Sequence, residues 1–461
     1  MPRWTASPDV SAPPGPARVC QPPWEAPPAV AAAGPPQGGA LALLGYGALL
    51  LYLFVYLSRI LDITLPYLRI PLILNVVFAG AVVVSGGVAG FFRSRIGLLM
   101  VALYGWMALC VPFSVWRRGS VETMVQAFRS LVLMAAIIGL VSTTRRCLRV
   151  MHTIGLAALL AAGVSAIAGG HDLTERLILV KGTFADPNYY CLLLYLGLPF
   201  LWLRARMAKD PLGKALYLVG ALWVLAAGAA TGSRTGFAAL CASVAVLFFR
   251  ASAGRKLQIV LVSVTLVLLA GLFVSDYILL RYTTYFSVTP REGLTEKELG
   301  YLEAGAVGST EGRLQILRRS LELTARHPLF GVGPGMFPVA EHEDAKAQGR
   351  QKGAWLETHN SLTQISSETG LPGLFLYAAI LILAVGSTSR LSTLAAPPGE
   401  PYWEKVRTAA RYLQASFFGA LAGAMFLSIA YQGILFVLLG LIVALEQAVA
   451  REFRPKASPP G

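Results

Sequence analysis

His359 is the residue whose type and setting most clearly suit chemistry. It opens the segment HNSLTQISSETGLPG, which predicts a short helix that follows Asn360 and ends at Gly370. Pro372 then suits the first turn of an apolar span. The positive end of a helix dipole disfavours an imidazolium, so a histidine at a helix start can stay neutral and accept a proton. A histidine that only caps the helix or lies at the membrane interface fits the same spacing, and spacing alone does not establish the chemical role.

Arg234 lies in AATGSRTGFAAL, where we expect a tight turn between two apolar spans. Ser233, Thr235 and Gly236 leave backbone N–H groups around it that can face an anion. An arginine that only extends from a helix end to the membrane surface fits equally well.

Arg313 lies near the start of a helix predicted in STEGRLQILRRSLELTARHPLFGVGPG. A guanidinium beside the N–H groups of a helix start is a good phosphate site. The alternative is an ordinary solvated helix charge. Arg318 and Arg319 follow on the same helix and are weaker candidates for substrate binding.

The predicted helix around Arg313 also has an apolar stripe, formed by Leu314, Leu317 and Leu321. Thr310 can cap its start, and we expect it to end at His327, which precedes a proline. Such a helix could lie on a membrane surface.

A fourth candidate segment is KGTFADPNYY. Lys181 could meet an anionic substrate, and Asp186 followed by Pro187 is the usual pattern of a helix cap and first turn. Lys181, Asp186 and Asn188 are therefore candidates for substrate binding, with a purely structural cap as the alternative. The glycines of GVGPGMF are expected to shape a turn, because no GK[ST] follows them as in a phosphate-binding loop.

Several catalytic motifs are absent from the sequence. It contains no DxD pair that would hold a metal–nucleotide complex, no HExxH and no GxSxG. We therefore expect anion binding to rest on arginines, with no metal ion and no cofactor.

The elements that must position these residues are membrane spans. The 461 residues are 55% hydrophobic and only 14% charged, whereas soluble chains carry about a quarter charged residues. Apolar stretches near the roughly 20 residues that cross a bilayer recur along the chain. The fold is predicted to be all-α, a polytopic integral membrane protein with about twelve transmembrane helices, at 41–57, 70–91, 96–116, 122–141, 149–168, 188–203, 214–231, 235–249, 257–275, 371–388, 412–430 and 432–449. A turn is assumed between the last two.

The distribution of basic residues sets the orientation. With the N-terminus inside, more than half of the 39 Lys and Arg fall in inner segments, which supports cytoplasmic termini and an even number of spans. The long polar segment 276–370 then lies outside, between the ninth and tenth spans. Because it contains a predicted helix and turn, a functional loop is favoured over a disordered one. The predicted organisation is a disordered Pro/Ala-rich cytoplasmic tail (1–40), spans one to nine (41–275), an extracytoplasmic catalytic loop (276–370), spans ten to twelve (371–450) and a cytoplasmic tail (451–461).

The charge and the cysteines exclude other classes. The net charge is +15, but the basic residues lie between apolar segments, so no nucleic-acid partner is expected. The five cysteines show no spacing typical of a zinc site or a disulfide framework.

Together these motifs resemble the O-antigen ligase family and its O-antigen polymerase relatives. HNSLTQISSETGLPG has His, Asn, nine residues and then Gly-x-x-Gly, as in the family signature. The resemblance extends to GTFADPN before one span, SRTG before another and HPLFGVGPGMF in the loop, and covers about residues 180–390.

The resemblance implies glycan transfer outside a bacterial cytoplasmic (inner) membrane, with the site facing the periplasm or the cell exterior. Such enzymes take a glycan from an undecaprenyl diphosphate carrier; ligases pass it to lipid A–core, and polymerases to another carrier-linked repeat of an O-antigen or exopolysaccharide. By family pattern, His359 matches the essential histidine and Arg234 and Arg313 the essential arginines. The implied partners are the lipid-linked glycan donor, a lipid or glycan acceptor and membrane lipids.

Two other classes compete with a glycosyltransferase. A transporter of the same lipid-linked glycan would show internal repeats or charged residues at mid-membrane, and neither is clear here. An assembly factor would use the outer loop only as a binding surface. Ligase and polymerase remain open alternatives, because one sequence does not show the shape of the acceptor groove.

Overall fold

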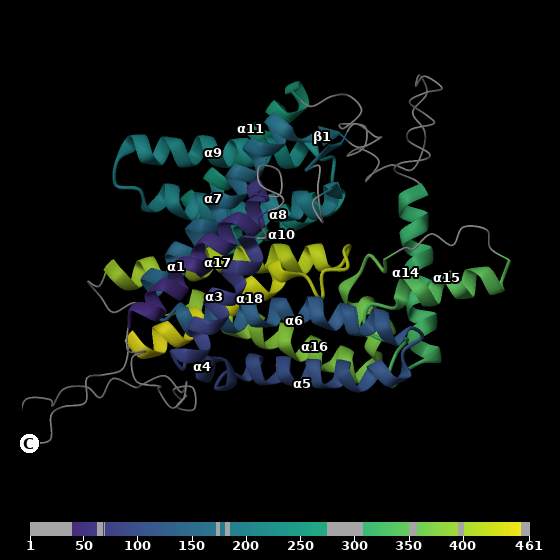
Figure 1. Ribbon diagram of the computed structural model, residues 1–461. Helices are drawn as coiled ribbons and strands as arrows, with labels where there is room; N and C mark the ends of the chain where they lie inside the picture. Colours follow the sequence, from purple (N-terminus) through teal and green to yellow (C-terminus); the bar gives the residue numbers. More distant parts are fainter. Residues whose placement is uncertain are drawn as a thin grey trace, which may run out of the picture. The chain divides into compact units, whose positions relative to one another are not determined.

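The computed structural model describes residues 39–61, 68, 70–171, 176–179, 185–273, 308–349, 357–394 and 401–452 (Figure 1). The predicted N-terminal tail lies outside this part except for Gly39 and Ala40, and so do Lys181 and most of the predicted C-terminal tail. The described chain is almost entirely helical.

Among the residues that the structure describes, the elements form a run of helices interrupted by one small antiparallel pair of strands, in which Gly170 is opposite Ile178. In chain order they are α1 (Ala40–Ser58), α3 (Ile70–Val84), α4 (Val88–Phe92), α5 (Arg95–Cys110), η1 (Val111–Phe113), α6 (Arg117–Leu140), α7 (Thr144–Ala168), β1 (Gly170–His171), β2 (Leu177–Ile178), α8 (Pro187–Met207), α9 (Pro211–Ala230), α10 (Arg234–Phe249), α11 (Ala253–Phe273), α14 (Gly308–Arg326), α15 (Phe337–Ala347), α16 (Ser361–Ser392), α17 (Pro401–Ala424) and α18 (Gly433–Glu452).

Each predicted span overlaps at least one of these helices. Within the described ranges, seven helices are long and apolar enough to cross a membrane, namely α1, α5 continued by η1, α6, α7, α9, α16 and α18. Helices α3 and α10 are apolar but shorter. The chain is therefore an all-α membrane protein.

Three predicted boundaries are wrong. The range 70–91 is two helices, because the chain turns at Gly86, whose φ of 70° is favourable only for glycine. Helix α17 ends at Ala424 instead of residue 430, so a non-helical segment, 425–432, precedes α18. The described part of α14 already contains Thr310, which is therefore not its N-cap, although the helix ends before His327 as predicted.

The helices pack closely where small residues lie at their contacts, as is common between transmembrane helices. Helix α18 packs against α6, α7, α16 and α17, and most of its side chains are buried. A Cβ on Gly440 of α18 would lie 3.2 Å from Ile137 of α6, and one on Gly45 of α1 would lie 2.3 Å from the Cβ of Ala81 in α3. These glycines let the helix backbones approach closely.

The candidate site residues are carried by helices that contact one another. Helix α10 packs against α8 and α17, and α16 packs against α14 and α17. In Figure 1, α14 runs across the direction of α5 and α6. Helix α17 and the residues 425–432 that follow it thus link the starts of α8, α10 and α16, where the sequence motifs lie.

Candidate functional site

The helix that follows His359 has the start and the break that the sequence predicts. Asn360 is the N-cap of α16, and its side-chain oxygen accepts hydrogen bonds from the N–H groups of Leu362 (2.9 Å) and Thr363 (3.1 Å). At Gly370 the backbone has φ 71° and ψ −175°, a conformation that is essentially limited to glycine. The helix is broken there, and the free N–H of Leu371 donates to the carbonyl of Pro328 at 2.8 Å.

The polar side chains of the first half of α16 hold the non-helical segment 425–432, which we call the α17–α18 loop. Asn360 donates through Nδ2 to the carbonyl of Met425 (3.1 Å). Ser361 donates through Oγ to the carbonyl of Leu427 (2.7 Å) and accepts from the N–H of Ile429 (2.9 Å). These bonds satisfy backbone groups that no helix pairs, which an apolar environment requires.

Gln364 and Glu368 extend the same helical face, because positions 360, 364 and 368 are four residues apart. The side-chain oxygen of Gln364 accepts from the N–H of Ala430 at 3.3 Å. Glu368 is 2% exposed, and its Oε2 accepts from the Tyr431 hydroxyl (2.7 Å) and from the N–H of Gly335 (2.8 Å). Glu368 therefore joins the α17–α18 loop to the glycine-rich turn before α15.

His359 itself has a left-handed backbone, with φ 50°. Its N–H donates to the Oγ of Ser428 at 3.1 Å, and that hydroxyl also pairs with the Oγ1 of Thr358 at 2.9 Å. Non-glycine residues adopt this conformation only where surrounding contacts impose it. The α17–α18 loop is thus the element that fixes the backbone of the histidine.

The electrostatic setting of His359 favours a neutral imidazole. Burial lowers its pKa, the positive charge of Arg313 lowers it further, and the negative charge of Asp186 acts in the opposite direction. The neutral state agrees with the expectation from the sequence, but the main cause is burial instead of the helix dipole. A neutral histidine can accept a proton at neutral pH.

Arg313 reaches the turn that carries Arg234. Its Nη1 lies 3.5 Å from the Oγ1 of Thr235, the residue after Arg234 at the start of α10. Ser233 caps that helix and accepts from the N–H of Gly236 at 3.1 Å. The contact brings two of the predicted cationic segments together, beside the histidine whose pKa Arg313 lowers.

A buried arginine that the sequence analysis does not single out lies at the same junction. Arg176 is 7% exposed and donates to the carbonyl of Thr231 (2.8 Å) and to the side-chain oxygen of Asn188 (3.0 Å). Ser233 donates to that same oxygen at 2.9 Å. Asn188 therefore ties α8 to the start of α10, and its role in substrate binding stays a prediction.

Asp186 is the N-cap of α8, as its sequence pattern predicts. Its Oδ1 accepts from the N–H groups of Asn188 (2.6 Å) and Tyr189 (3.2 Å), and Pro187 occupies the first turn. Because its charge raises the pKa of His359, the carboxylate also belongs to the electrostatic surroundings of the site.

Glu357 and Tyr189 are site residues that sequence reasoning missed. The Tyr189 hydroxyl donates to the Oε2 of Glu357 at 2.6 Å and lies 3.4 Å from the carbonyl of Ser428. Burial raises the pKa of the Glu357 carboxyl, and the negative charge of Asp186 raises it further. The only signal in the sequence was the position of Glu357 two residues before His359.

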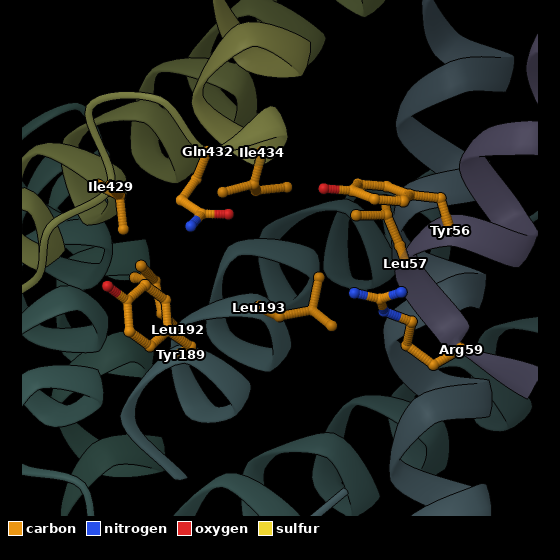
Figure 2. Close-up of a pocket in the computed structure, with 9 residues that line it drawn as sticks. All are labelled: Tyr56, Leu57, Arg59, Tyr189, Leu192, Leu193, Ile429, Gln432 and Ile434. Carbon is orange, nitrogen blue, oxygen red and sulfur yellow. The ribbon is translucent and has the colours of Figure 1, made fainter. Parts of the chain in front are cut away.

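A small pocket adjoins the other side of the α17–α18 loop. Figure 2 shows the guanidinium of Arg59 and the amide of Gln432 turned toward the space between α1, α8 and the start of α18. Its lining comprises Tyr56, Leu57, Arg59, Tyr189, Leu192, Leu193, Ile429, Gln432 and Ile434. The α17–α18 loop thus contacts His359 through Ser428. Through Gln432 it also borders this pocket, which contains the positive charge of Arg59.

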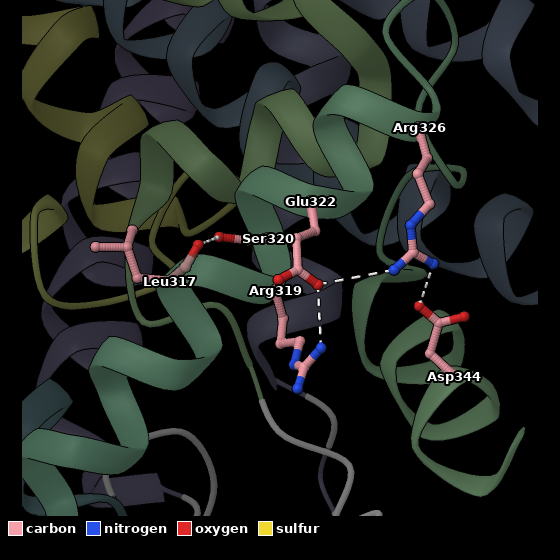
Figure 3. Close-up of polar contacts among 6 residues, drawn as sticks. All are labelled: Leu317, Arg319, Ser320, Glu322, Arg326 and Asp344. Atoms are coloured by element: carbon pink, nitrogen blue, oxygen red, sulfur yellow. Dashed lines mark hydrogen bonds and ion pairs between the residues drawn. The ribbon is translucent and has the colours of Figure 1, made fainter. Parts of the chain in front are cut away.

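The two weaker arginine candidates on α14 differ in setting. Arg318 is exposed. Arg319 donates to Glu322 at 3.1 Å, and Glu322 also lies 3.7 Å from Arg326, which binds Asp344 of α15 at 2.6 Å (Figure 3). This network neutralises Arg319 and links α14 to α15, so the structure gives Arg319 a structural partner.

The structure therefore brings together His359, Asn360, Arg313, Asp186 and the turn that bears Arg234. Lys181 lies outside the described residues. In the part of the chain that is described, no group of three or more His, Cys, Asp or Glu side chains is arranged to hold a metal ion.

Residues 219–378 match the family model described as O-Antigen ligase. This region belongs to that family. The matched O-antigen ligase region contains α10, α14, α15 and the first half of α16, and hence Arg234, Arg313 and His359. No curated protein matches the chain. The family resemblance of the motifs is confirmed over these residues.

Proposed function

We propose that the protein is a membrane glycosyltransferase of the O-antigen ligase type. It transfers a glycan from an undecaprenyl diphosphate carrier to an acceptor hydroxyl on the outer side of the cytoplasmic membrane. The observation that carries this proposal is the contact of Arg313 with Thr235, which joins two cationic segments of the family-matched region, with Arg313 close enough to His359 for its charge to lower the pKa of the histidine.

In the proposed reaction, the acceptor oxygen attacks the anomeric carbon of the donor glycan. The bond from that carbon to the diphosphate oxygen breaks, and its electron pair leaves with the diphosphate. His359 takes the proton of the acceptor hydroxyl, and Asp186 stabilises the resulting imidazolium. Arg234 and Arg313 stabilise the negative charge that develops on the leaving diphosphate, so the step needs no metal ion.

This direct displacement would invert the anomeric centre. Inversion is a hypothesis, and its check is the configuration of the new glycosidic bond in the product. A retained configuration would exclude the single inverting displacement.

The proposed topology has twelve spans, cytoplasmic termini and residues 276–370 outside, between the ninth and tenth spans. The charge distribution supports it. The apolar stripe of α14 also supports a position at the membrane surface, because Leu314 and Leu321 are about half exposed while Ile316 and Leu323 are buried.

A ligase and a polymerase that use the same donor differ in the acceptor to which they transfer the glycan. A strain that lacks the protein should accumulate long polymer on the carrier if the protein is a ligase, and single carrier-linked repeats if it is a polymerase. The measurement applies to cells with or without an outer membrane, since either species can be identified on the extracted carrier lipid.

Substitution of His359 distinguishes an enzyme from a transporter or an assembly factor. In proteoliposomes supplied with donor and acceptor, His359→Ala should reduce transfer by roughly 100-fold or more, the usual contribution of a general base. Donor binding should persist, because the arginines remain. Undiminished transfer by the folded variant would remove the histidine from the mechanism.

A further inference from the structure

Helices α8 and α17 carry arginines at the ends that lie away from the candidate site. The hydroxyl of Tyr189, near the start of α8, lies 3.4 Å from the carbonyl of Ser428, which follows α17. Farther along α8, the carbonyl of Leu196 accepts from the Oγ of Ser416 in α17 at 2.8 Å. The two helices are therefore antiparallel, and the end of α8 lies beside the start of α17. In the proposed topology these ends are cytoplasmic.

The register of these helices brings two arginines to one level. On α8, Arg206 lies ten residues beyond Leu196, a rise of about 15 Å at about 1.5 Å per residue. The same number of residues back from Ser416 along α17 leads to Val406, which directly precedes Arg407. Arg206 and Arg407 thus extend from neighbouring helices at the same depth.

Helix α10 adds a third arginine to this level. It begins at the candidate site, as α8 does, and the Oγ of Ser243 donates to the carbonyl of Ala415 in α17 at 2.9 Å. Seven residues beyond Ser243 is Arg250, directly after α10, and seven residues before Ala415 is the neighbour of Arg407. The ends of α8 and α10 and the start of α17 therefore present arginines side by side.

The positive charges at this level act on one another. Burial lowers the pKa of Arg411, one turn farther along α17, and the charges of four other arginines lower it further. We call the whole set the arginine cluster; it consists of Arg206, Arg250, Arg255 at the start of α11, Arg407 and Arg411. Arg411 donates through Nε to the neutral carbonyl of Ser392 at 3.3 Å. The Nε of Arg407 is buried and has no hydrogen-bond partner in the described chain.

No carboxylate among the described residues forms an ion pair with the arginine cluster. Of the acidic residues in the same segments, Asp210 accepts from the N–H of Gly213 as the cap of α9, and Glu404 is exposed. The setting of Arg390 is different, because it binds Glu446 at 3.1 Å. The cluster is therefore a concentration of like charge that an anion would stabilise.

Exposed apolar side chains border the arginine cluster. Phe249, directly before Arg250, is 75% exposed, and Leu257, two residues after Arg255, is 60% exposed. In a membrane, such side chains face hydrocarbon chains. A phosphate group attached to apolar chains therefore matches both parts of this surface, whereas a soluble phosphate compound would match only the arginines.

We propose that the arginine cluster binds the phosphate of an anionic phospholipid in the cytoplasmic leaflet. The inference goes beyond the proposed function and does not depend on the proposed reaction. Guanidinium groups donate paired hydrogen bonds to phosphate oxygens, and the negative charge offsets the repulsion among the arginines. The opposite ends of α8, α10 and α17 carry Asp186, the turn of Arg234 and the α17–α18 loop. The lipid thus holds together the helices that position the candidate site.

Lipid titration tests the proposed site. The protein is held in a neutral maltoside detergent, dioleoylphosphatidylglycerol is added in steps, and the thermal midpoint is measured while native mass spectrometry counts the retained lipid. We expect the midpoint to rise, because a ligand that binds the folded state stabilises it, and we expect no rise with phosphatidylethanolamine. No rise with phosphatidylglycerol would overturn the proposal. An equal rise with glycerol phosphate would also overturn it and would indicate a soluble phosphate compound.

Two pairs of substitutions separate the arginine cluster from general surface charge. Arg250→Gln with Arg255→Gln removes two cluster charges, whereas Arg93→Gln with Arg95→Gln removes two exposed positive charges between α4 and α5. An arginine near an anionic headgroup changes affinity about fivefold, so affinity for phosphatidylglycerol should fall about 25-fold in the first pair. In the second pair it should change by less than about twofold. Equal losses in both pairs, or no loss in the first, would contradict the cluster.

A charge-conserving pair separates lost charge from altered packing. Arg250→Lys with Arg255→Lys keeps both positive charges and loses only the planar guanidinium, so affinity should stay within about threefold of that of the unmodified protein. The thermal midpoint without lipid establishes that each variant is folded. A folded lysine pair that binds phosphatidylglycerol as weakly as the glutamine pair would show that these charges do not hold the lipid, and the proposal would fail.

Discussion

The left-handed backbone of His359 costs roughly 1–3 kcal/mol, which surrounding contacts must offset. Ser428 and Thr358 supply two of these contacts, and the N-cap Asn360 supplies the next along the chain. The conformation orients the histidine independently of helix α16, so its side chain need not follow the helical face. Its neutrality was predictable from its position, whereas the charge of Arg313 beside it was not, because the two residues are far apart in sequence.

At this scale the charge of Asp186 gives a prediction about pH. Asp186→Asn removes the carboxylate that raises the pKa of His359 and keeps the helix cap, because asparagine caps as well as aspartate. The pKa of His359 should then fall further. A base acts only when unprotonated, so the acid limb of kcat/KM should move to lower pH, measured from about pH 5 to 8.

Asp210 provides the control for this experiment. It caps α9 through the N–H of Gly213, and Asp210→Asn makes the same chemical change at another helix start. Its pH profile should match that of the unmodified protein. An acid limb that moves to higher pH in Asp186→Asn, or that moves equally in both variants, would show that His359 is not the titrating base.

Among the elements, α16 depends most on a single backbone conformation. Gly370→Ala places a Cβ about 2.2 Å from the carbonyl oxygen of Leu329, at φ 71°. The backbone strain alone is of order 1–3 kcal/mol, and the clash adds to it. We expect a clear fall in the thermal midpoint of the detergent-solubilised protein, together with loss of transfer. Gly386→Ala on the same helix, where the nearest atom is 3.5 Å away, should retain both within error.

The α17–α18 loop gives a second prediction at this scale. Tyr431→Phe removes one hydrogen bond to buried Glu368 and should destabilise the protein by about 1–2 kcal/mol. Because the same loop holds His359 through Ser428, kcat should fall while KM for the donor changes little. Tyr217→Phe removes a hydroxyl bond to His152 at 3.0 Å, between α7 and α9, and should reduce stability without reducing kcat. Equal kcat values in the two variants would leave Glu368 and Tyr431 with a structural role only.

Local signals predicted elements better than they predicted the contacts between elements. Asn360, Gly370 and Pro372 encode the start and the break of α16 within a few residues, and Asp186 encodes the cap of α8. The end of α17 was misjudged because MFLSIAYQ is as apolar as a membrane helix. Its backbone is satisfied by Ser361 and Gln364, more than sixty residues earlier, and hydropathy contains no information about such partners.

For the molecule as a whole, the family-matched region does not form the candidate site alone. Residues 219–378 contribute Arg234, Arg313 and His359, but Ser428 lies after the region and Asp186 before it. The α17–α18 loop and the start of α8 therefore complete the surroundings of the histidine. A fragment limited to the matched region would lack the hydrogen bond that fixes the backbone of His359 and the charge that balances Arg313.

The orientation of the chain gives the last prediction. If both termini are cytoplasmic, the exposed Lys346 of α15 lies outside and the exposed Lys209 between α8 and α9 lies inside. In a variant whose five cysteines are replaced by serine, Lys346→Cys should react with a membrane-impermeant maleimide in intact spheroplasts. Lys209→Cys should react only after the membrane is opened. Both substitutions remove one positive charge from an exposed position, so they perturb folding similarly. The opposite labelling pattern would place His359 on the cytoplasmic side, where a diphosphate-linked donor presented to the outer face could not reach it.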